Sequence, residues 1–236
     1  MIYSYKQRVG MSHVREDWTL DPGVALDWLQ DAAMYHVVEA KCGPAQLEEE
    51  NLGWVINCWD VYYDQPCQFL DTLTVSTWAH DFDRVLAHRN FEIVNSAGET
   101  CLRADTRWFL MELDKQMPVR IREKYLTRDM LDPALDLPPI NRHVKLPEEM
   151  EARPALGTPL YAVDANRHMN NVWYVRYALE YLPEGFRLKR LRAEYVNSAH
   201  YGDRIYPYVA GETGTVWVDL RDKDGKSFVK LEFREA

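Results

Sequence analysis

Three polar side chains stand at alternate positions just before an apolar helical pattern: Asp164, Asn166 and His168. Alternate residues of an extended segment point to the same side, so we expect the three to converge on one cavity. A histidine titrates near neutrality and can activate water, while an amide and an acid fix its orientation and tautomer. The spacing therefore predicts a hydrolytic site. The structural alternative is that Asn170 or Asn171 caps the helix and Asp164 favours the positive end of its dipole, which would not explain the alternation of Asp164, Asn166 and His168.

The helix expected over residues 170–182 supports this chemistry. Asn170 and Asn171 stand where it begins, and either side chain can accept hydrogen bonds from its first amides. Free amides at a helix start can also hold the oxyanion of a carbonyl under attack, an effect on the order of 3 kcal/mol per donor. We therefore expect the oxyanion to be received at this helix start.

The elements that must position this site fall into two similar halves separated by a proline-rich stretch. An amphipathic helix is expected over residues 22–40, because apolar residues recur at helical spacing after Asp21 and Pro22. Runs rich in β-branched and aromatic residues predict strands over 54–63, 71–82, 84–94 and 100–113, and after the second helix over 188–196, 203–212, 215–222 and 226–235. Six prolines interrupt residues 114–158, which we interpret as a linker or crossover.

A weak internal repeat relates the halves. Four residue pairs carry it: Tyr63 with Tyr195, Asp71 with Asp203, Leu73 with Ile205, and Gly98 with Gly225. A lone antiparallel sheet has an apolar face to bury, and the helix in each half supplies the cover. The sequence thus predicts an α+β protein of two tandem hotdog domains, each a sheet wrapped around a central helix. The expected boundaries are 1–130 for the N-terminal domain, 131–153 for the linker and 154–236 for the C-terminal domain.

Composition narrows the class of protein. The net charge of −9 argues against a general nucleic-acid binder, which carries a basic face. The four cysteines form no CxxC pair and are expected to be buried thiols. No run of about 18 apolar residues occurs and the first residues lack a signal-peptide pattern, so we expect a cytoplasmic protein without a membrane span.

Several motifs together resemble one family. "DANRHMNNVWY" (164–174) is similar to the D-x-N-x-H-x-N-N-x-x-Y signature of the plant and bacterial acyl-acyl-carrier-protein (acyl-ACP) thioesterases. "LQDAAMYHV" (29–37) and "GETCLRADTRWFLMELD" (98–114) resemble that family's first helix and its strand motif. The resemblance implies a double-hotdog enzyme that hydrolyses fatty acyl-ACP in fatty acid biosynthesis, with Asp164, Asn166 and His168 on catalytic positions and no metal or organic cofactor.

The chain departs from the family at one position. The resemblance implies a catalytic Glu on the strand after the second helix, where this sequence has Ser198, followed by Ala199 in place of the Cys of the plant enzymes. Three alternatives stay open. Ser198 holds the water by itself as a third catalytic position, His200 on the same strand face substitutes, or the enzyme is slow on the usual substrate.

The partner expected from the resemblance is acyl carrier protein with its phosphopantetheine-linked acyl chain. A candidate patch for this acidic partner is the basic cluster Arg120, Arg122, Lys124 and Arg128, which could equally be a solvated linker. The alternatives to an acyl-ACP thioesterase are an acyl-CoA thioesterase on the same fold and a non-catalytic acyl-binding protein. We expect a monomer or homodimer that binds no nucleic acid.

Overall fold

The structure is a computed structural model that describes residues 1–235. The chain divides into two compact units: unit 1 comprises residues 1–57 and 61–140, and unit 2 comprises residues 58–60 and 141 onward. Each unit is described by itself. No helix within residues 1–235 has the length and apolar character needed to cross a membrane.

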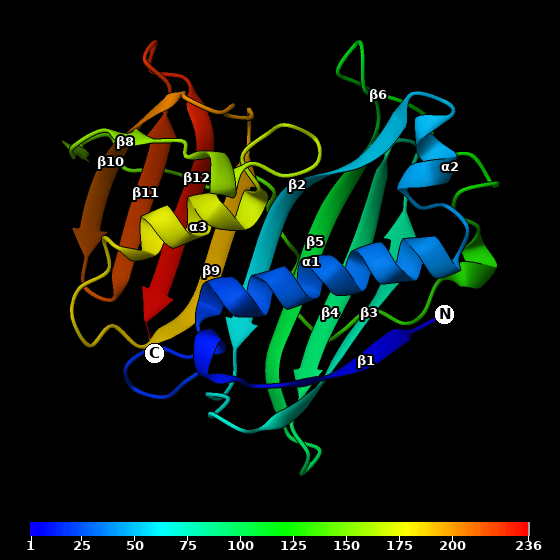
Figure 1. Cartoon of the computed structure of the whole chain (residues 1–236), viewed down its shortest axis with the longest axis horizontal. Helices are drawn as coiled ribbons and strands as arrows, with labels where there is room; N and C mark the ends of the chain where they lie inside the picture. Colours follow the sequence, from blue (N-terminus) through cyan, green and yellow to red (C-terminus); the bar gives the residue numbers. More distant parts are fainter. Residues whose placement is uncertain (236) are drawn as a thin grey trace. The chain divides into compact units, whose positions relative to one another are not determined.

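Unit 1 is an antiparallel sheet with one long helix lying across it (Figure 1). Its sheet has the strand order β1-β3-β4-β5-β2, with β6 paired to β5. The elements are β1 (Tyr3–Arg8), α1 (Pro22–Glu39), α2 (Pro44–Glu48), β2 (Leu52–Tyr63), β3 (Thr72–Phe82), β4 (Leu86–Val94), β5 (Thr100–Glu112) and β6 (Met117–Pro118), with 3-10 turns η1 (Met11–His13) and η2 (Arg128–Met130).

Local chemistry explains where α1 begins and which face it buries. The Asp21 carboxylate accepts a hydrogen bond from the Val24 amide at 3.0 Å, and Pro22 occupies the first turn, where its missing N–H costs nothing. Leu26 and Leu29 are fully buried on the side that contacts β3 and β1. Burying each such side chain stabilises the fold by roughly 1.5–3 kcal/mol.

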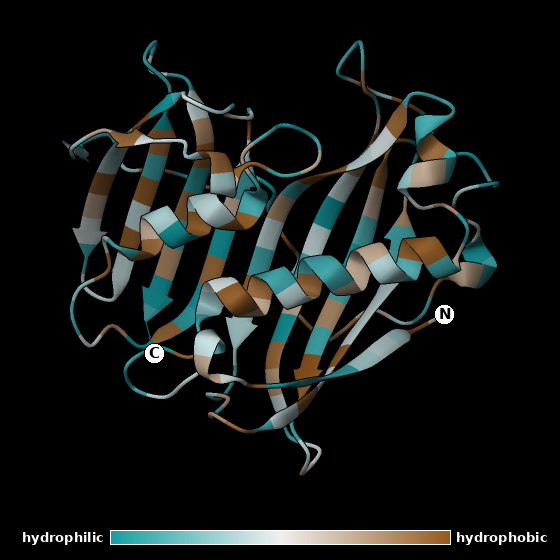
Figure 2. Ribbon diagram, in the orientation of Figure 1, coloured by the Kyte–Doolittle hydropathy of each residue, from teal (hydrophilic) through white to brown (hydrophobic). Residues whose placement is uncertain are grey.

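Unit 2 repeats the arrangement with a shorter helix. The sheet order is β9-β12-β11-β10-β7, with β8 paired to β10, and α3 packs on β11 and β12 (Figure 1). The elements are β7 (Glu151–Ala152), β8 (Leu156–Gly157), η3 (Leu160–Ala162), α3 (Asn171–Leu179), β9 (Leu188–Tyr195), β10 (Arg204–Glu212), β11 (Thr215–Arg221) and β12 (Ser227–Glu235). Hydrophobic and hydrophilic residues alternate along the strands of both units (Figure 2), as expected when one sheet face is buried beneath a helix.

The predicted fold class is confirmed: each unit is an antiparallel sheet wrapped around one helix, the hotdog arrangement. Both predicted helices and all eight predicted strands are present, with α3 ending at Leu179 and not at residue 182. The elements that were not predicted are β1, whose alternate residues are exposed, the short helix α2, the two-residue strands β6, β7 and β8, and the 3-10 turns.

The internal repeat corresponds to equivalent places in the two units. Tyr63 and Tyr195 end β2 and β9. Leu73 and Ile205 are both fully buried near the start of β3 and β10. Gly98 and Gly225 adopt the left-handed conformation, with φ of 82° and 80°, in the hairpins before β5 and β12. The low-identity match in the sequence therefore reflects a structural duplication.

The repeat extends to the loops around each helix start, which we call the loop frame: residues 9–21 with 67–71 in unit 1, and residues 158–170 with 199–203 in unit 2. A tight turn is closed by the bridge Val14–Leu20 in unit 1 and by Val163–Met169 in unit 2. Three pairs of backbone hydrogen bonds are equivalent, the first of each pair lying in unit 1 and the second in unit 2. Arg15 N donates to Thr19 O as Asp164 N does to His168 O, both at 2.9 Å. Leu20 N donates to Cys67 O (2.9 Å) as Met169 N does to Ala199 O (2.8 Å), and Val9 N donates to Asp71 O (2.8 Å) as Thr158 N does to Asp203 O (2.9 Å). The two loop frames thus share one backbone hydrogen-bond pattern.

Candidate active site

The segment that carries Asp164, Asn166 and His168 is a tight turn, so the expectation of an extended segment is wrong. Asp164 N donates to His168 O at 2.9 Å, and the Asp164 carboxylate accepts from Asn166 N at 2.8 Å. Arg167 completes the reversal in the left-handed region, with φ of 63°. The reason is local, because an Asp side chain readily bonds the backbone two residues ahead and so favours a turn over a strand.

The turn separates the three predicted catalytic side chains. Asp164 and His168 stand at its two ends and are half-buried, whereas Asn166 lies at its exposed tip. Burial and the neighbouring His200 lower the pKa of His168 from its usual value, and the charge of Asp164 opposes them. A lowered pKa leaves the imidazole neutral at pH 7, the form that can accept a proton.

The helix start is capped as the structural alternative predicted. The Asn170 side chain accepts from Val172 N at 2.9 Å, and its carbonyl accepts from Trp173 N at 3.0 Å. The carbonyl of Asn171 accepts the hydroxyl of Tyr195 at 2.9 Å. Because the amides of Val172 and Trp173 already donate to Asn170, the amide of Asn171 is the donor that would bind an oxyanion at this helix start.

The position of the family's Glu lies in a loop after β9. Ser198 is exposed, while Ala199 is fully buried and tied at both backbone groups. Its amide donates to the Tyr174 hydroxyl at 2.7 Å, and its carbonyl accepts from Met169 N at 2.8 Å. This loop is thereby joined to the residue that follows His168 and to helix α3.

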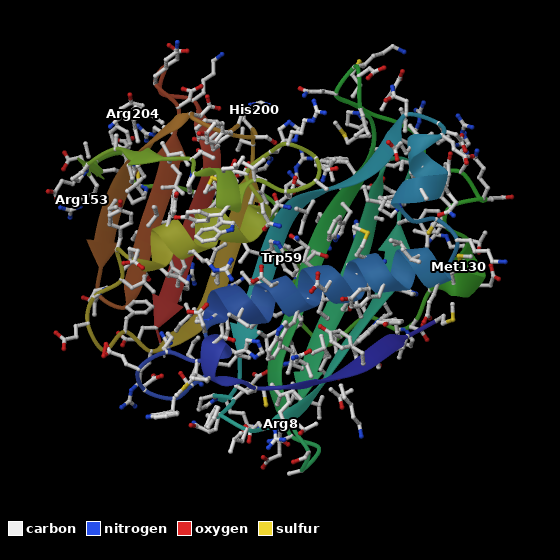
Figure 3. All side chains as sticks on the ribbon, in the orientation of Figure 1. Arg8, Trp59, Met130, Arg153, His200 and Arg204 are labelled. Atoms are coloured by element: carbon white, nitrogen blue, oxygen red, sulfur yellow. The ribbon has the colours of Figure 1, made fainter. Side chains whose placement is uncertain are left out.

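His200 brings a second imidazole to the site. It lies in this loop and not on a strand face, because β9 ends at Tyr195. Its ring stands edge-on to that of His168, with the centroids 4.7 Å apart and the planes at 67°. Figure 3 labels His200 at the upper end of the strands of unit 2. Of the open alternatives at this position, His200 is the residue whose side chain contacts His168.

Two further residues were missed by sequence reasoning. Asp203 accepts from His200 N at 2.7 Å, and its carboxylate oxygen lies 3.6 Å from His200 Nδ1. Tyr174 holds Ala199, and burial raises the pKa of its phenol. Each had a signal: Tyr174 is the last residue of the D-x-N-x-H-x-N-N-x-x-Y match, and Asp203 belongs to the Gly-Asp pair after Ser198. Within residues 1–235, no group of three His, Cys, Asp or Glu side chains is arranged to hold a metal ion.

The basic cluster expected to meet an acidic partner lies in unit 1 and is partly neutralised. Lys124 and Arg122 pair with Glu50, the latter at 3.8 Å. Arg128 pairs with Asp81 at 2.7 Å. Arg120 is exposed. The positive electrostatic potential of this cluster is therefore weaker than four unpaired basic residues would produce.

Solved structures share the fold over the whole chain. An acyl-ACP thioesterase from Bacteroides thetaiotaomicron superimposes with a TM-score of 0.90 at 20% identity, covering 100% of this chain and 98% of that one. The 12:0-ACP thioesterase of Umbellularia californica gives a TM-score of 0.87 at 17% identity, covering 100% and 97%. At these identities the likeness concerns the fold alone.

Relatives are also found by sequence. The oleoyl-acyl carrier protein thioesterase 2 of Arabidopsis thaliana, a chloroplastic protein, is 28% identical over 234 residues, which cover 89% of this chain and 64% of that protein. A chloroplastic palmitoyl-acyl carrier protein thioesterase of Gossypium hirsutum is 25% identical over 214 residues, covering 83% and 51%. The chain spans between about half and two thirds of the length of these relatives.

The two halves of the chain each match a family model. Residues 2–128 match the acyl-ACP thioesterase N-terminal domain and residues 152–227 match the acyl-ACP thioesterase C-terminal domain. With both domains matched in order, the chain belongs to the acyl-ACP thioesterase family.

Proposed function

We propose that this protein is a thioesterase that hydrolyses fatty acyl-acyl carrier protein to a free fatty acid and holo-carrier protein. Membership of the acyl-ACP thioesterase family supports the substrate class. One observation carries the chemistry: His168 is half-buried beside Asp164 and His200, with a pKa lowered from its usual value. A neutral imidazole in a partly dry site suits the activation of water.

In the proposed reaction, His168 accepts a proton from water while the water oxygen bonds to the acyl carbon. Asp164 holds the turn that presents His168, and Asn166 positions the substrate or the water from the turn's tip. The carbonyl oxygen becomes an oxyanion at the start of α3, received by the amide of Asn171. The C–S bond then breaks, and the departing thiolate takes the proton from His168, which returns to its neutral form.

The partner in this proposal is the acidic carrier protein. Arg120 and the partly paired Arg122, Lys124 and Arg128 are the proposed contact, acting on the rate of encounter more than on final affinity. The division into an N-terminal domain (1–130), a linker (131–153) and a catalytic C-terminal domain (154–236) belongs to the same proposal. So does a cytoplasmic location.

The test is thiol release from acyl-ACP and acyl-CoA over a series of chain lengths. We expect turnover of acyl-ACP with a higher kcat/KM than of the matching acyl-CoA. The variant His168→Ala should lose at least about 100-fold in kcat/KM, the low end for removal of a general base. The control Lys223→Ala changes an exposed residue of the hairpin before β12 and should match wild type. Full activity in His168→Ala would refute the proposed site, and wild type without turnover would favour an acyl-binding protein.

A further inference from the structure

We propose that His200, held by Asp203, is a positioning residue for His168: its ring stands edge-on to that of His168 and disfavours a second positive charge there, so that His168 remains the neutral base. This inference rests on the proposed function, because it assigns a role within that site. Ser198 carries no group that ionises near pH 7 and is exposed, whereas His200 is the ionisable side chain in contact with His168.

The contact between the imidazoles follows from the loop frame and not from the rotamer of one side chain. In unit 1 the equivalent positions are Thr19 and Gln68, and these two residues form a backbone bridge. In unit 2 the backbone bond from Met169 N to Ala199 O, at 2.8 Å, joins the residues next to His168 and His200. Histidines placed at these two positions are therefore neighbours.

Asp203 holds one of the two imidazoles, that of His200, in place. Its carboxylate bonds the backbone amide of His200 at 2.7 Å and lies 3.6 Å from Nδ1, close enough to pair with a protonated ring. His168 is more buried than His200, whose side chain is 60% exposed. Burial and the neighbouring His200 both oppose protonation of His168, whereas the charge of Asp164 favours it. The phenol of Tyr174, which accepts from the amide of Ala199, adds no charge here because burial raises its pKa.

The loop frame also supplies a substitution that the fold accommodates. Asp71 bonds the amide of Gln68 at 2.7 Å, as Asp203 bonds that of His200. Glutamine is thus the natural residue of unit 1 at this place. His200→Gln removes the ionisable ring while retaining a side chain already seen in the same backbone setting. His200→Lys retains a positive charge at this position without the ring.

The experiment is NMR titration of His168 in the full chain, combined with the pH profile of kcat/KM. In His200→Gln, we expect the pKa of His168 to rise by at least about half a pH unit, the effect of one charge at 4.7 Å even with the screening of bulk water. The acidic limb of the kcat/KM profile should move to higher pH by the same amount. His200→Lys should keep both as low as in wild type. Tyr201→Phe, an exposed neighbour in the same loop, is the matched control and should change neither.

Two results would overturn this role. One is a His168 titration that does not change in His200→Gln. The other is an equal rise in His200→Gln and His200→Lys, which would mean that contact and not charge is what His200 supplies. The proposed function fails separately: wild type would then release no thiol from any acyl substrate, while the titration shift in His200→Gln would still be measured.

Discussion

Asp164 has two separable effects on His168, and two substitutions divide them. Its carboxylate closes the turn by accepting from Asn166 N at 2.8 Å, and its charge raises the pKa of His168. Asp164→Asn keeps an oxygen that can close the turn but removes the charge. Asp164→Ala removes both. The difference between the variants therefore measures the geometric contribution of the turn.

The expected magnitudes follow from these contacts. A hydrogen bond from a backbone amide to a carboxylate in a half-exposed turn stabilises it by about 1–1.5 kcal/mol. If that energy holds His168 in its reactive position, Asp164→Ala should lose roughly tenfold in kcat/KM, since 1.4 kcal/mol corresponds to a factor of ten. Asp164→Asn should stay within about threefold of wild type at pH 8, where His168 is neutral in every variant.

The pH dependence gives the second readout. Because the charge of Asp164 raises the pKa of His168, removing it lowers that pKa, and His168 stays neutral to a lower pH. The acidic limb of kcat/KM should move to lower pH in both variants. The assay is thiol release between pH 5 and pH 9 at saturating and limiting acyl-ACP. If Asp164→Asn were as impaired as Asp164→Ala at pH 8, the turn would not be the reason for the acid at this position.

The other predictions concern the cap, the tyrosine and the basic cluster. Asn170→Ala should lower the free energy of unfolding by about 1 kcal/mol in urea titrations, because Val172 N loses its acceptor, while Asn170→Asp should retain wild-type stability. Tyr174→Phe leaves the buried amide of Ala199 without a partner and should cost about 1–3 kcal/mol by the same measurement. Changing Arg120 and Arg122 together to Glu should raise KM for acyl-ACP several-fold at low salt and leave KM for acyl-CoA unchanged; an equal change with both substrates would exclude the cluster as the carrier contact.

Elements determined by local chemistry could be predicted from the sequence. Helix α1 was recognisable from Asp21, Pro22 and helical spacing, and these signals act within one turn of the chain. The eight strands were recognisable because β-branched and aromatic runs recur between turn residues. Strand β1 was missed, since its six residues are stabilised mainly by pairing with β3, a contact that no local pattern encodes.

The site was predicted in its residues more than in its geometry. The alternation of Asp164, Asn166 and His168 suggested a strand, although Asp followed by Asn two residues later also favours a side-chain-closed turn. The left-handed Arg167 could not be foreseen, because that conformation is uncommon for a residue other than Gly, Asn or Asp. The approach of His200 to His168 depends on a backbone bond between distant segments, and only the internal repeat hinted at it.

The duplicated loop frame offers a second place for the side chains of the proposed catalytic site. Unit 1 has kept the same turn, with Trp18 left-handed at φ of 65° where unit 2 has Arg167, and it places Thr19 and Gln68 where unit 2 has its two histidines. The backbone pattern therefore folds with either set of side chains. For protein engineering, Thr19→His and Gln68→His would place an imidazole pair on the same backbone pattern in unit 1, with loss of the hydrogen bond that the Thr19 hydroxyl donates to Asp17 at 2.6 Å.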